Sequence, residues 1–239
     1  MRSHRFSWLL PCLAVVLASA VAAPSALAKS KKKTFTTEFG IERCTFASQD
    51  SGAGAANPLF PLVVGSQIVL EEKGVRVVIT TLDETESITF TSRDGDTIPV
   101  TARVVEEREF EDGELVEVSR NFFARCVETS DVFYFGEEVD PPEGSWRAGV
   151  DGAQPGIVMP GTFLLGARYF QEQAPGIAMD RAEHIQMDLE IHTDAGDFED
   201  CVLVEETSPL EHGTSTKKYC PGVGLVFDDG AVLTEIHAP

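Results

Sequence analysis

Residues 185–192 read Ile-Gln-Met-Asp-Leu-Glu-Ile-His, a strict alternation of apolar and polar side chains, and the turn-forming pair Ala195-Gly196 follows. Successive side chains of a β-strand point to opposite faces of the sheet, so this period of two predicts a half-buried strand. The predicted core face carries Ile185, Met187, Leu189 and Ile191. From residue 67 onward no stretch repeats its apolar residues at the helical period, so we expect little helix.

Turn signals of the same kind separate other strand-like runs. Glycine supplies the positive φ that tight hairpins require, so each signal predicts a hairpin. The signals are Asp94-Gly95, Glu111-Asp112-Gly113, Ala195-Gly196 and Asp228-Asp229-Gly230. Type II turns are predicted at Pro155-Gly156, Pro175-Gly176 and Pro221-Gly222. The pattern predicts a mainly all-β protein, whose strongly twisted antiparallel sheet forms a barrel, half-barrel or sandwich, because closure hides strand edges.

The amino-terminal residues have the organisation of a signal peptide. Arg2 and Arg5 precede an apolar run over residues 6–21, and Ala26-Leu27-Ala28 is a small-residue cleavage site. We therefore predict a signal peptide over residues 1–28 and export to the periplasm or beyond, without a membrane span. Residues 29–56 are predicted to form a flexible leader with a first strand or loop. Residues 57–239 are predicted to form one antiparallel β domain.

The chain is strongly acidic, with a formal net charge of −20. Loss of residues 1–28 leaves 17 Lys and Arg against 39 Asp and Glu, a net charge of −22. Such a protein repels nucleic acid and anionic lipid, which excludes them as electrostatically steered partners. Cationic partners and divalent cations are favoured instead, although most of this charge is expected simply to cover a solvated surface.

Four cysteines remain once Cys12 is removed with the signal peptide. An even number in an oxidising compartment predicts two disulfides, for which three pairings exist. Cys201 and Cys220 flank a predicted hairpin with its turn near residues 209–213, and equal distances from that turn place them opposite each other. We therefore predict that Cys201 pairs with Cys220, which leaves Cys44 to pair with Cys126.

Local signatures of catalysis are missing from the sequence, which contains no Gly-x-Ser-x-Gly, Walker, His-Glu-x-x-His or Cys-x-x-Cys motif. This favours a protein that is not an enzyme. The loop carboxylates Glu137, Glu138 and Asp151, together with Asp140 and Glu143, are candidate ligands for calcium, or simply acidic loop residues. The sequence suggests no other cofactor. The same stretch, Glu137 to Asp151, could supply the acid and base of a hydrolase. The scattered histidines are expected to be exposed.

Aromatic residues concentrate in the middle of the chain, and the run Phe133-Tyr134-Phe135 places rings on both faces of one strand. One face belongs to the core, and the other must be covered by a loop, a partner or a ligand. Core packing accounts for these rings most simply. As the ligand-binding alternative we name Phe133, Phe135, Trp146 and Tyr169.

Four motifs carry a family resemblance. They are NPLFPL at residues 57–62, YFGE at 134–137, AGVDGAQPGIVMP at 148–160 and KYCPGVG at 218–224. In this order they resemble the recurring motifs of a family of uncharacterised bacterial exported proteins, which implies a protein of the bacterial envelope or a secreted one and implies no activity. Cys126 and Cys220 depart from the family pattern, so the resemblance makes the disulfides a local addition.

Taken together, the sequence predicts an exported, non-catalytic binding module for an apolar or amphipathic small molecule or an envelope component. The alternatives are a hydrolase that uses the loop carboxylates and a structural interaction protein. An enclosed apolar cavity would favour the binding module. Carboxylates that converge in a cleft would favour the hydrolase, and a continuous exposed edge or patch the interaction protein.

Overall fold

The computed structural model describes residues 33–48, 56–142 and 144–239, and residues 35–239 form one compact unit. The predicted signal peptide and Glu143 therefore lie outside the described residues. Within these ranges, no helix has the length and apolar character needed to cross a membrane.

The regular secondary structure of the described residues is almost entirely β-strand, which confirms the predicted all-β class. One short 3-10 helix, η1, covers Ile41–Arg43. The strands are β1 (Phe46–Ala47), β2 (Gln67–Glu72), β3 (Val75–Thr91), β4 (Thr97–Glu111), β5 (Glu114–Cys126), β6 (Val132–Asp140), β7 (Trp146–Arg147), β8 (Gln154–Met159), β9 (Arg168–Phe170), β10 (Glu172–Gln173), β11 (Arg181–Thr193), β12 (Gly196–Thr207), β13 (Ser215–Cys220), β14 (Gly224–Asp228) and β15 (Ala231–His237).

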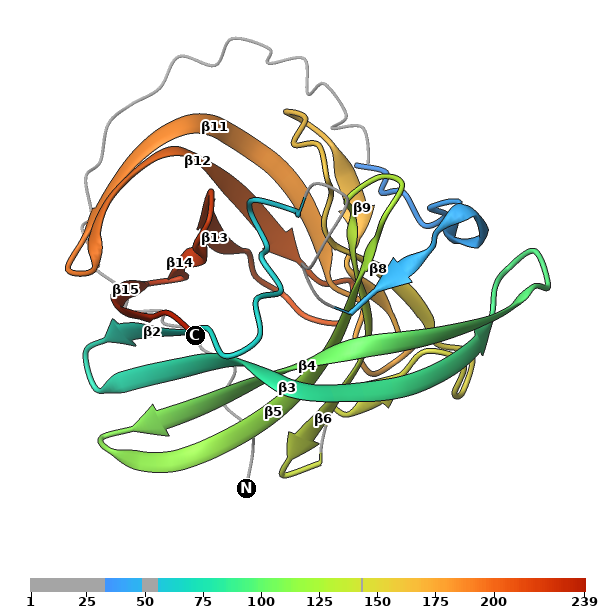
Figure 1. Cartoon of the computed structure of the whole chain (residues 1–239), viewed down its shortest axis with the longest axis horizontal. Coiled ribbons are helices and arrows are strands. Elements are labelled where there is room, and N and C mark those ends of the chain that lie inside the picture. Colours follow the sequence, from blue (N-terminus) through green and yellow to red (C-terminus); the bar gives the residue numbers. More distant parts are fainter. Residues whose placement is uncertain (1–32, 49–55, 143) are drawn as a thin grey trace, which may run out of the picture. The chain divides into compact units, whose positions relative to one another are not determined.

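The strands form one antiparallel sheet in the order β10-β8-β6-β5-β4-β3-β2-β15-β14-β13-β12-β11-β9, with β1 paired to β5 and β7 to β6. The two edge strands β9 and β10 are neighbours in the chain, separated only by Gln171. A single segment therefore completes both edges, and the sheet curls nearly into a barrel (Figure 1). Such closure protects the edges from pairing with other chains.

Gly156 lies where this closure is tightest. A Cβ at this position would come within 2.3 Å of the Phe170 carbonyl oxygen, so only glycine permits the approach of β8 to residues 170–171. The predicted type II turn at Pro155-Gly156 is wrong, because both residues belong to β8. The turns at Pro175-Gly176 and Pro221-Gly222 are present, with positive φ at both glycines.

All four predicted hairpins form, because each turn signal lies between two paired strands. The predicted core face of residues 185–191, however, is half wrong. Ile185 and Met187 are 41% and 39% exposed, whereas Leu189 and Ile191 pack against a buried cluster. Three register shifts interrupt the pairing of β11 with β12, and Asp188 has a φ of 57°. These bulges rotate the side chains and break the period of two.

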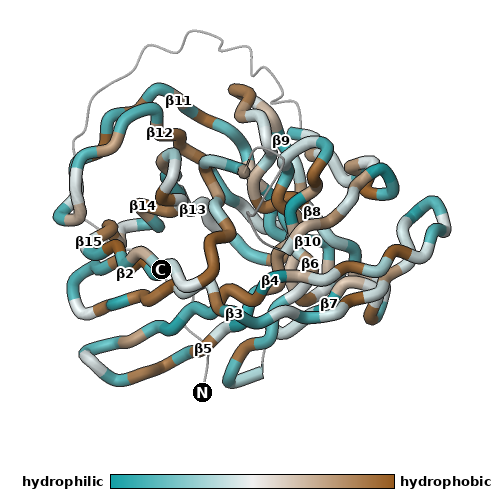
Figure 2. The backbone as a smooth tube through the Cα atoms, in the orientation of Figure 1, coloured by the Kyte–Doolittle hydropathy of each residue, from teal (hydrophilic) through white to brown (hydrophobic). Residues whose placement is uncertain are grey.

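The hollow of the curled sheet is crossed by residues 57–66, which we call the inner segment (Figure 1). Phe60 packs edge-on against Phe123 of β5, with ring centroids 5.0 Å apart. At the opposite wall, the Gly222 N–H donates to the Pro58 carbonyl at 2.7 Å. Figure 2 shows hydrophobic residues on this segment and the strands around it, whereas the outlying turns are mostly hydrophilic. The inner segment thus fills part of the interior.

A second segment, residues 35–48, packs against the outer part of β5 and β6, and we call it the strap. Phe46 pairs with Cys126, and Thr36 exchanges two backbone hydrogen bonds with β9 at 2.9 and 3.0 Å. A disulfide joins Cys44 to Cys126, and a second joins Cys201 to Cys220. This is the pairing that the hairpin argument predicts, and Val202 lies opposite Tyr219 as its register requires.

Candidate functional site

The predicted aromatic residues lie in the core. Phe133 and Phe135 are fully buried, and Phe46 of the strap packs edge-on against both rings at 5.6 and 5.2 Å. The chain itself therefore covers this aromatic face. Trp146 and Tyr169 are also buried, and the indole N–H of Trp146 has no hydrogen-bond partner among the described residues. A role of these four residues in ligand binding stays a prediction.

His184 corrects the expectation that the histidines are exposed. It is buried, its Nε2 lies 2.9 Å from the Tyr169 hydroxyl oxygen, and its ring stacks on Phe163 at 3.7 Å between centroids. Burial lowers its pKa to about 4, so the imidazole is neutral at physiological pH. A neutral ring is compatible with its apolar surroundings, which indicates a packing role.

The predicted calcium ligands occupy different local settings. Glu137 lies opposite Trp146 in the pairing of β6 with β7, and Glu138 forms an ion pair with Arg147. Asp151 is exposed in a turn with a φ of 49°. Within the described ranges these carboxylates do not belong to a group of three mutually close metal ligands. Calcium binding stays a prediction, with no geometry in its support.

Residues of β2, β15 and the turn of the β11–β12 hairpin line an open hollow of about 610 Å³. Figure 1 shows this turn near β2 and β15. We call this hollow the arch groove. Its lining combines apolar residues of β15 with charged residues of β2 and of the hairpin turn. The lining residues are Glu71, Glu72, Lys73, His192, Thr193, Asp194, Val232, Leu233 and Thr234. The sequence predicted none of them as a binding residue, since β2 and the hairpin turn meet only in the folded chain.

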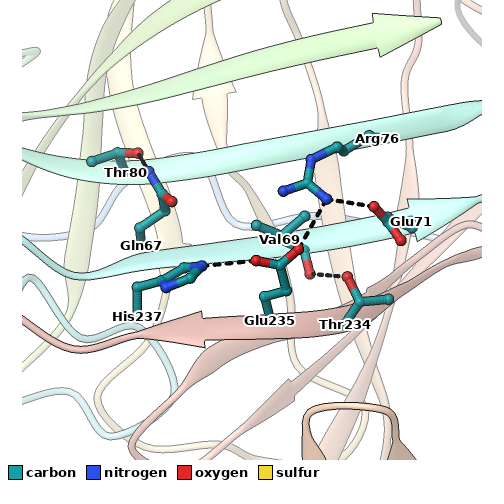
Figure 3. Close-up of polar contacts among 8 residues, drawn as sticks. All are labelled: Gln67, Val69, Glu71, Arg76, Thr80, Thr234, Glu235 and His237. Atoms are coloured by element: carbon teal, nitrogen blue, oxygen red, sulfur yellow. Dashed lines mark hydrogen bonds and ion pairs between the residues drawn. The ribbon is translucent and has the colours of Figure 1, made fainter. Parts of the chain in front are cut away.

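The wall of the arch groove is held by an ion-pair network across three strands (Figure 3). The Arg76 guanidinium bridges Glu71 of β2 and Glu235 of β15, and its Nη1 lies 3.0 Å from Glu235 Oε1. His237 Nε2 lies 2.9 Å from the other oxygen of Glu235. Arg76 is therefore shared between two carboxylates, and Glu71, Glu72 and Asp194 are the acidic residues of the groove lining.

His192 and Lys73 are the cationic candidates of the rim. His192 Nδ1 lies 2.7 Å from Asp197, and the hydrogen bond to that carboxylate raises the histidine pKa. Both partners are exposed, so the pair contributes little to stability. When His192 is protonated, its charge is balanced by Asp197. The groove thus offers a charged rim of mixed sign beside the half-buried side chain of Val232.

A second set of polar residues, the Lys217 cluster, faces the concave side of the sheet. It consists of Glu107, Glu172, Glu206, Lys217, Tyr219 and Asp228, which come from five strands. Lys217 Nζ lies 3.2 Å from Glu206 and 3.6 Å from Asp228. Glu107 on β4 repels Asp228 on β14, although β3, β2 and β15 separate these strands. That path along the sheet is about 19 Å, so the two carboxylates approach across the interior.

Burial shapes the titration of this cluster. Desolvation and repulsion by Asp228 raise the pKa of Glu107 to about 7, and burial with repulsion by Asp180 raises that of Glu172 well above its usual range. Burial alone would lower the pKa of Lys217, but attraction to Asp228 and Glu206 raises it well above 10.5. Lys217 is therefore the one cation of a cluster that contains four carboxylates.

Comparisons with known proteins give little further guidance. No protein-family model matches the chain, and no curated protein matches it. The chain is similar to a solved crystal structure described as a "putative lipoprotein from Parabacteroides distasonis ATCC 8503". That likeness covers 77% of this chain and all of the other, at 17% identity and a TM-score of 0.42. A likeness of this size does not indicate a function, so a functional assignment rests on the fold and the site alone.

Proposed function

We propose that the protein is an exported, non-catalytic binding module of the bacterial envelope, and that an amphipathic ligand occupies the arch groove. The supporting observation is the hollow of about 610 Å³, a volume within the roughly 300 to 1,000 Å³ typical of small-molecule sites. Val232, which is half-buried, would contact the apolar part of the ligand, and the charged rim would hold its polar head.

The charge of the protein favours a cationic head group. Arg76 is shared between Glu71 and Glu235, so the groove lining holds the carboxylates Glu71, Glu72 and Asp194 against the cationic candidates Lys73 and His192. The protein as a whole is strongly acidic. Complementary charge accelerates the approach of such a ligand and disfavours anionic competitors. Export is supported by the signal-peptide pattern of residues 1–28 and by the two disulfides, which persist in oxidising compartments.

The hydrolase alternative has weaker support, because Glu137, Glu138 and Asp151 line neither the arch groove nor the second hollow beneath the strap. That second hollow, of about 210 Å³, lies between strap residues 37–43 and the β3–β4 turn. It is smaller than the usual size of a ligand site.

The test is calorimetric titration with decyltrimethylammonium below its micelle concentration, compared with decyl sulfate and with tetramethylammonium. The cationic amphiphile should bind and raise Tm. At a free ligand concentration of 100 times its Kd, binding should add about 2.7 kcal/mol to the free energy of unfolding. Tetramethylammonium lacks the apolar chain and decyl sulfate has the wrong charge, so both should bind much more weakly. Equal binding of both amphiphiles would contradict the role of the rim.

Two tryptophan variants locate the site. Val232→Trp should fill the groove and abolish binding, whereas Leu210→Trp adds the same ring at an exposed position that does not line the groove and should leave binding unchanged. Glu72→Gln with Asp194→Asn should weaken the cationic amphiphile without changing the fold. Binding that survives Val232→Trp would exclude the arch groove as the site.

A further inference from the structure

The two disulfides differ in one chemical respect. Glu128 Oε2 lies 3.5 Å from the Cys126 Sγ, and the ligand atoms of Cys44, Cys126 and Glu128 all lie within 4.8 Å of one another. Among the described residues, this is the one group of three such ligands. Cys201 and Cys220, by contrast, have no carboxylate in a comparable group within the described ranges.

We propose that reduction of the Cys44–Cys126 disulfide creates a binding site for a thiophilic divalent cation such as zinc. Two cysteine sulfurs and one carboxylate oxygen are donors that zinc prefers, at about 2.3 Å and 2.0–2.2 Å respectively. Water would complete a tetrahedral set. The Thr45 N–H donates to Glu128 Oε2 at 2.7 Å and so holds the carboxylate beside the sulfurs.

The strap permits the small movement that metal binding requires. The sulfurs of a zinc site lie further apart than bonded sulfurs, so Cys44 must shift once the bond is broken. No strap residue is fully buried, and Cys44 itself is half-buried, whereas Cys126 is buried on β5. Cys201 and Cys220 are both fully buried on paired strands and lack this freedom.

The chemistry balances with a dithiol reductant. Thiol–disulfide exchange breaks the Cys44–Cys126 bond and supplies two electrons and two protons, while the dithiol closes to its own disulfide. The cation then displaces both thiol protons and forms two metal–sulfur bonds. The strap is consequently cross-linked to β5 by the disulfide or by the metal, and it lacks this cross-link only in the reduced, metal-free protein.

The experiment follows cobalt and zinc binding to the mature, exported chain before and after reduction. Cobalt should produce a thiolate charge-transfer band only after reduction, and a chromophoric chelator competition should give one zinc per chain. Cys201→Ser with Cys220→Ser should retain the site. Cys44→Ser with Cys126→Ser should lose it, and Glu128→Gln should weaken zinc binding about tenfold or more.

Circular dichroism keeps the result interpretable. If the reduced chain loses its fold, zinc should restore it in the wild type and in the Cys201/Cys220 double variant, but not in the Cys44/Cys126 double variant. Zinc that binds equally to the oxidised wild type, or to the reduced Cys44/Cys126 double variant, would overturn the proposal. So would a reduced wild type that gives no cobalt–thiolate band.

Discussion

The aromatic face of β5 and β6 and the Lys217 cluster belong to the same curled sheet, but the first buries rings and the second buries charges. Phe133 and Phe135 are fully buried and enclosed by rings of neighbouring segments. The Lys217 cluster instead places carboxylates of several strands around one amine, and the Lys217 side chain keeps 28% of its surface exposed. Burial of rings is favourable at every pH, whereas burial of charges is costly and depends on protonation. The aromatic face should therefore supply stability, and the cluster should make it pH-dependent.

The largest effect should come from the aromatic face. Phe133→Ala removes a fully buried ring and leaves a cavity, so the free energy of unfolding should fall by about 3–5 kcal/mol. Leu115→Ala, at a half-exposed position of β5, is the control and should change it by less than about 0.5 kcal/mol. Urea denaturation of both variants measures the difference. Similar losses in the two variants would show that the strap does not seal this face.

Removal of the one cluster cation should have the next largest effect. Lys217→Met leaves Glu206 and Asp228 without their partner in a poorly solvated setting, and we expect a loss of about 2 kcal/mol at pH 7, reduced by residual solvent access. Lys218→Met removes a neighbouring lysine that lies over the Phe227 ring, and it should cost about 1 kcal/mol or less. Equal losses would mean that Lys217 has no special role.

The cluster should also make stability fall as pH rises. The folded-state pKa of Glu107, about 7, exceeds its unfolded value of 4.5, so the folded protein holds the proton more tightly. Its contribution is fully favourable below about pH 4.5, is lost progressively up to about pH 7, and stays constant above that. Between pH 5 and pH 8 this contribution should decrease by about 1–2 kcal/mol, after allowance for solvent screening. Buried His184, whose pKa is lowered to about 4, acts in the opposite direction over the same interval. The Glu107 contribution is therefore measured as the difference between the urea-unfolding profiles of the wild type and Glu107→Gln.

Glu107→Gln is the matched variant for this titration. It keeps the size of the side chain, but the amide does not ionise. Between pH 5 and pH 8 the variant should therefore lose less free energy of unfolding than the wild type. At pH 8 the variant should be the more stable of the two. Glu114→Gln, at an exposed position of β5, should leave the pH profile unchanged. A wild type that loses no more stability than Glu107→Gln between pH 5 and pH 8 would contradict the burial of Glu107.

The sequence predicted the features that depend on residues close together in the chain. The hairpins follow from glycines between paired strands, and the Cys201–Cys220 pairing follows from one hairpin register. The approach of Glu107 to Lys217 depends instead on how strands far apart in the sheet curl, which no local pattern encodes. A weak signal existed in Val202, Val204 and Glu206, where a carboxylate replaces the third apolar residue of an inward series. The arch groove likewise requires distant segments to meet.

The smallest expected effects test the corrected hairpin. Met187→Gln and Ile185→Thr would each cost well over 1 kcal/mol if β11 kept a strict alternation, because both side chains would enter the core. In the bulged strand both are exposed by about two-fifths, so each should change the free energy of unfolding by less than about 0.5 kcal/mol. Leu189→Ala, whose side chain packs against the cluster of Cys201 and Cys220, should cost about 2 kcal/mol as the contrast. A large loss for Met187→Gln with none for Leu189→Ala would show that the bulges of β11 lie elsewhere. Met187, and not Leu189, would then face the core.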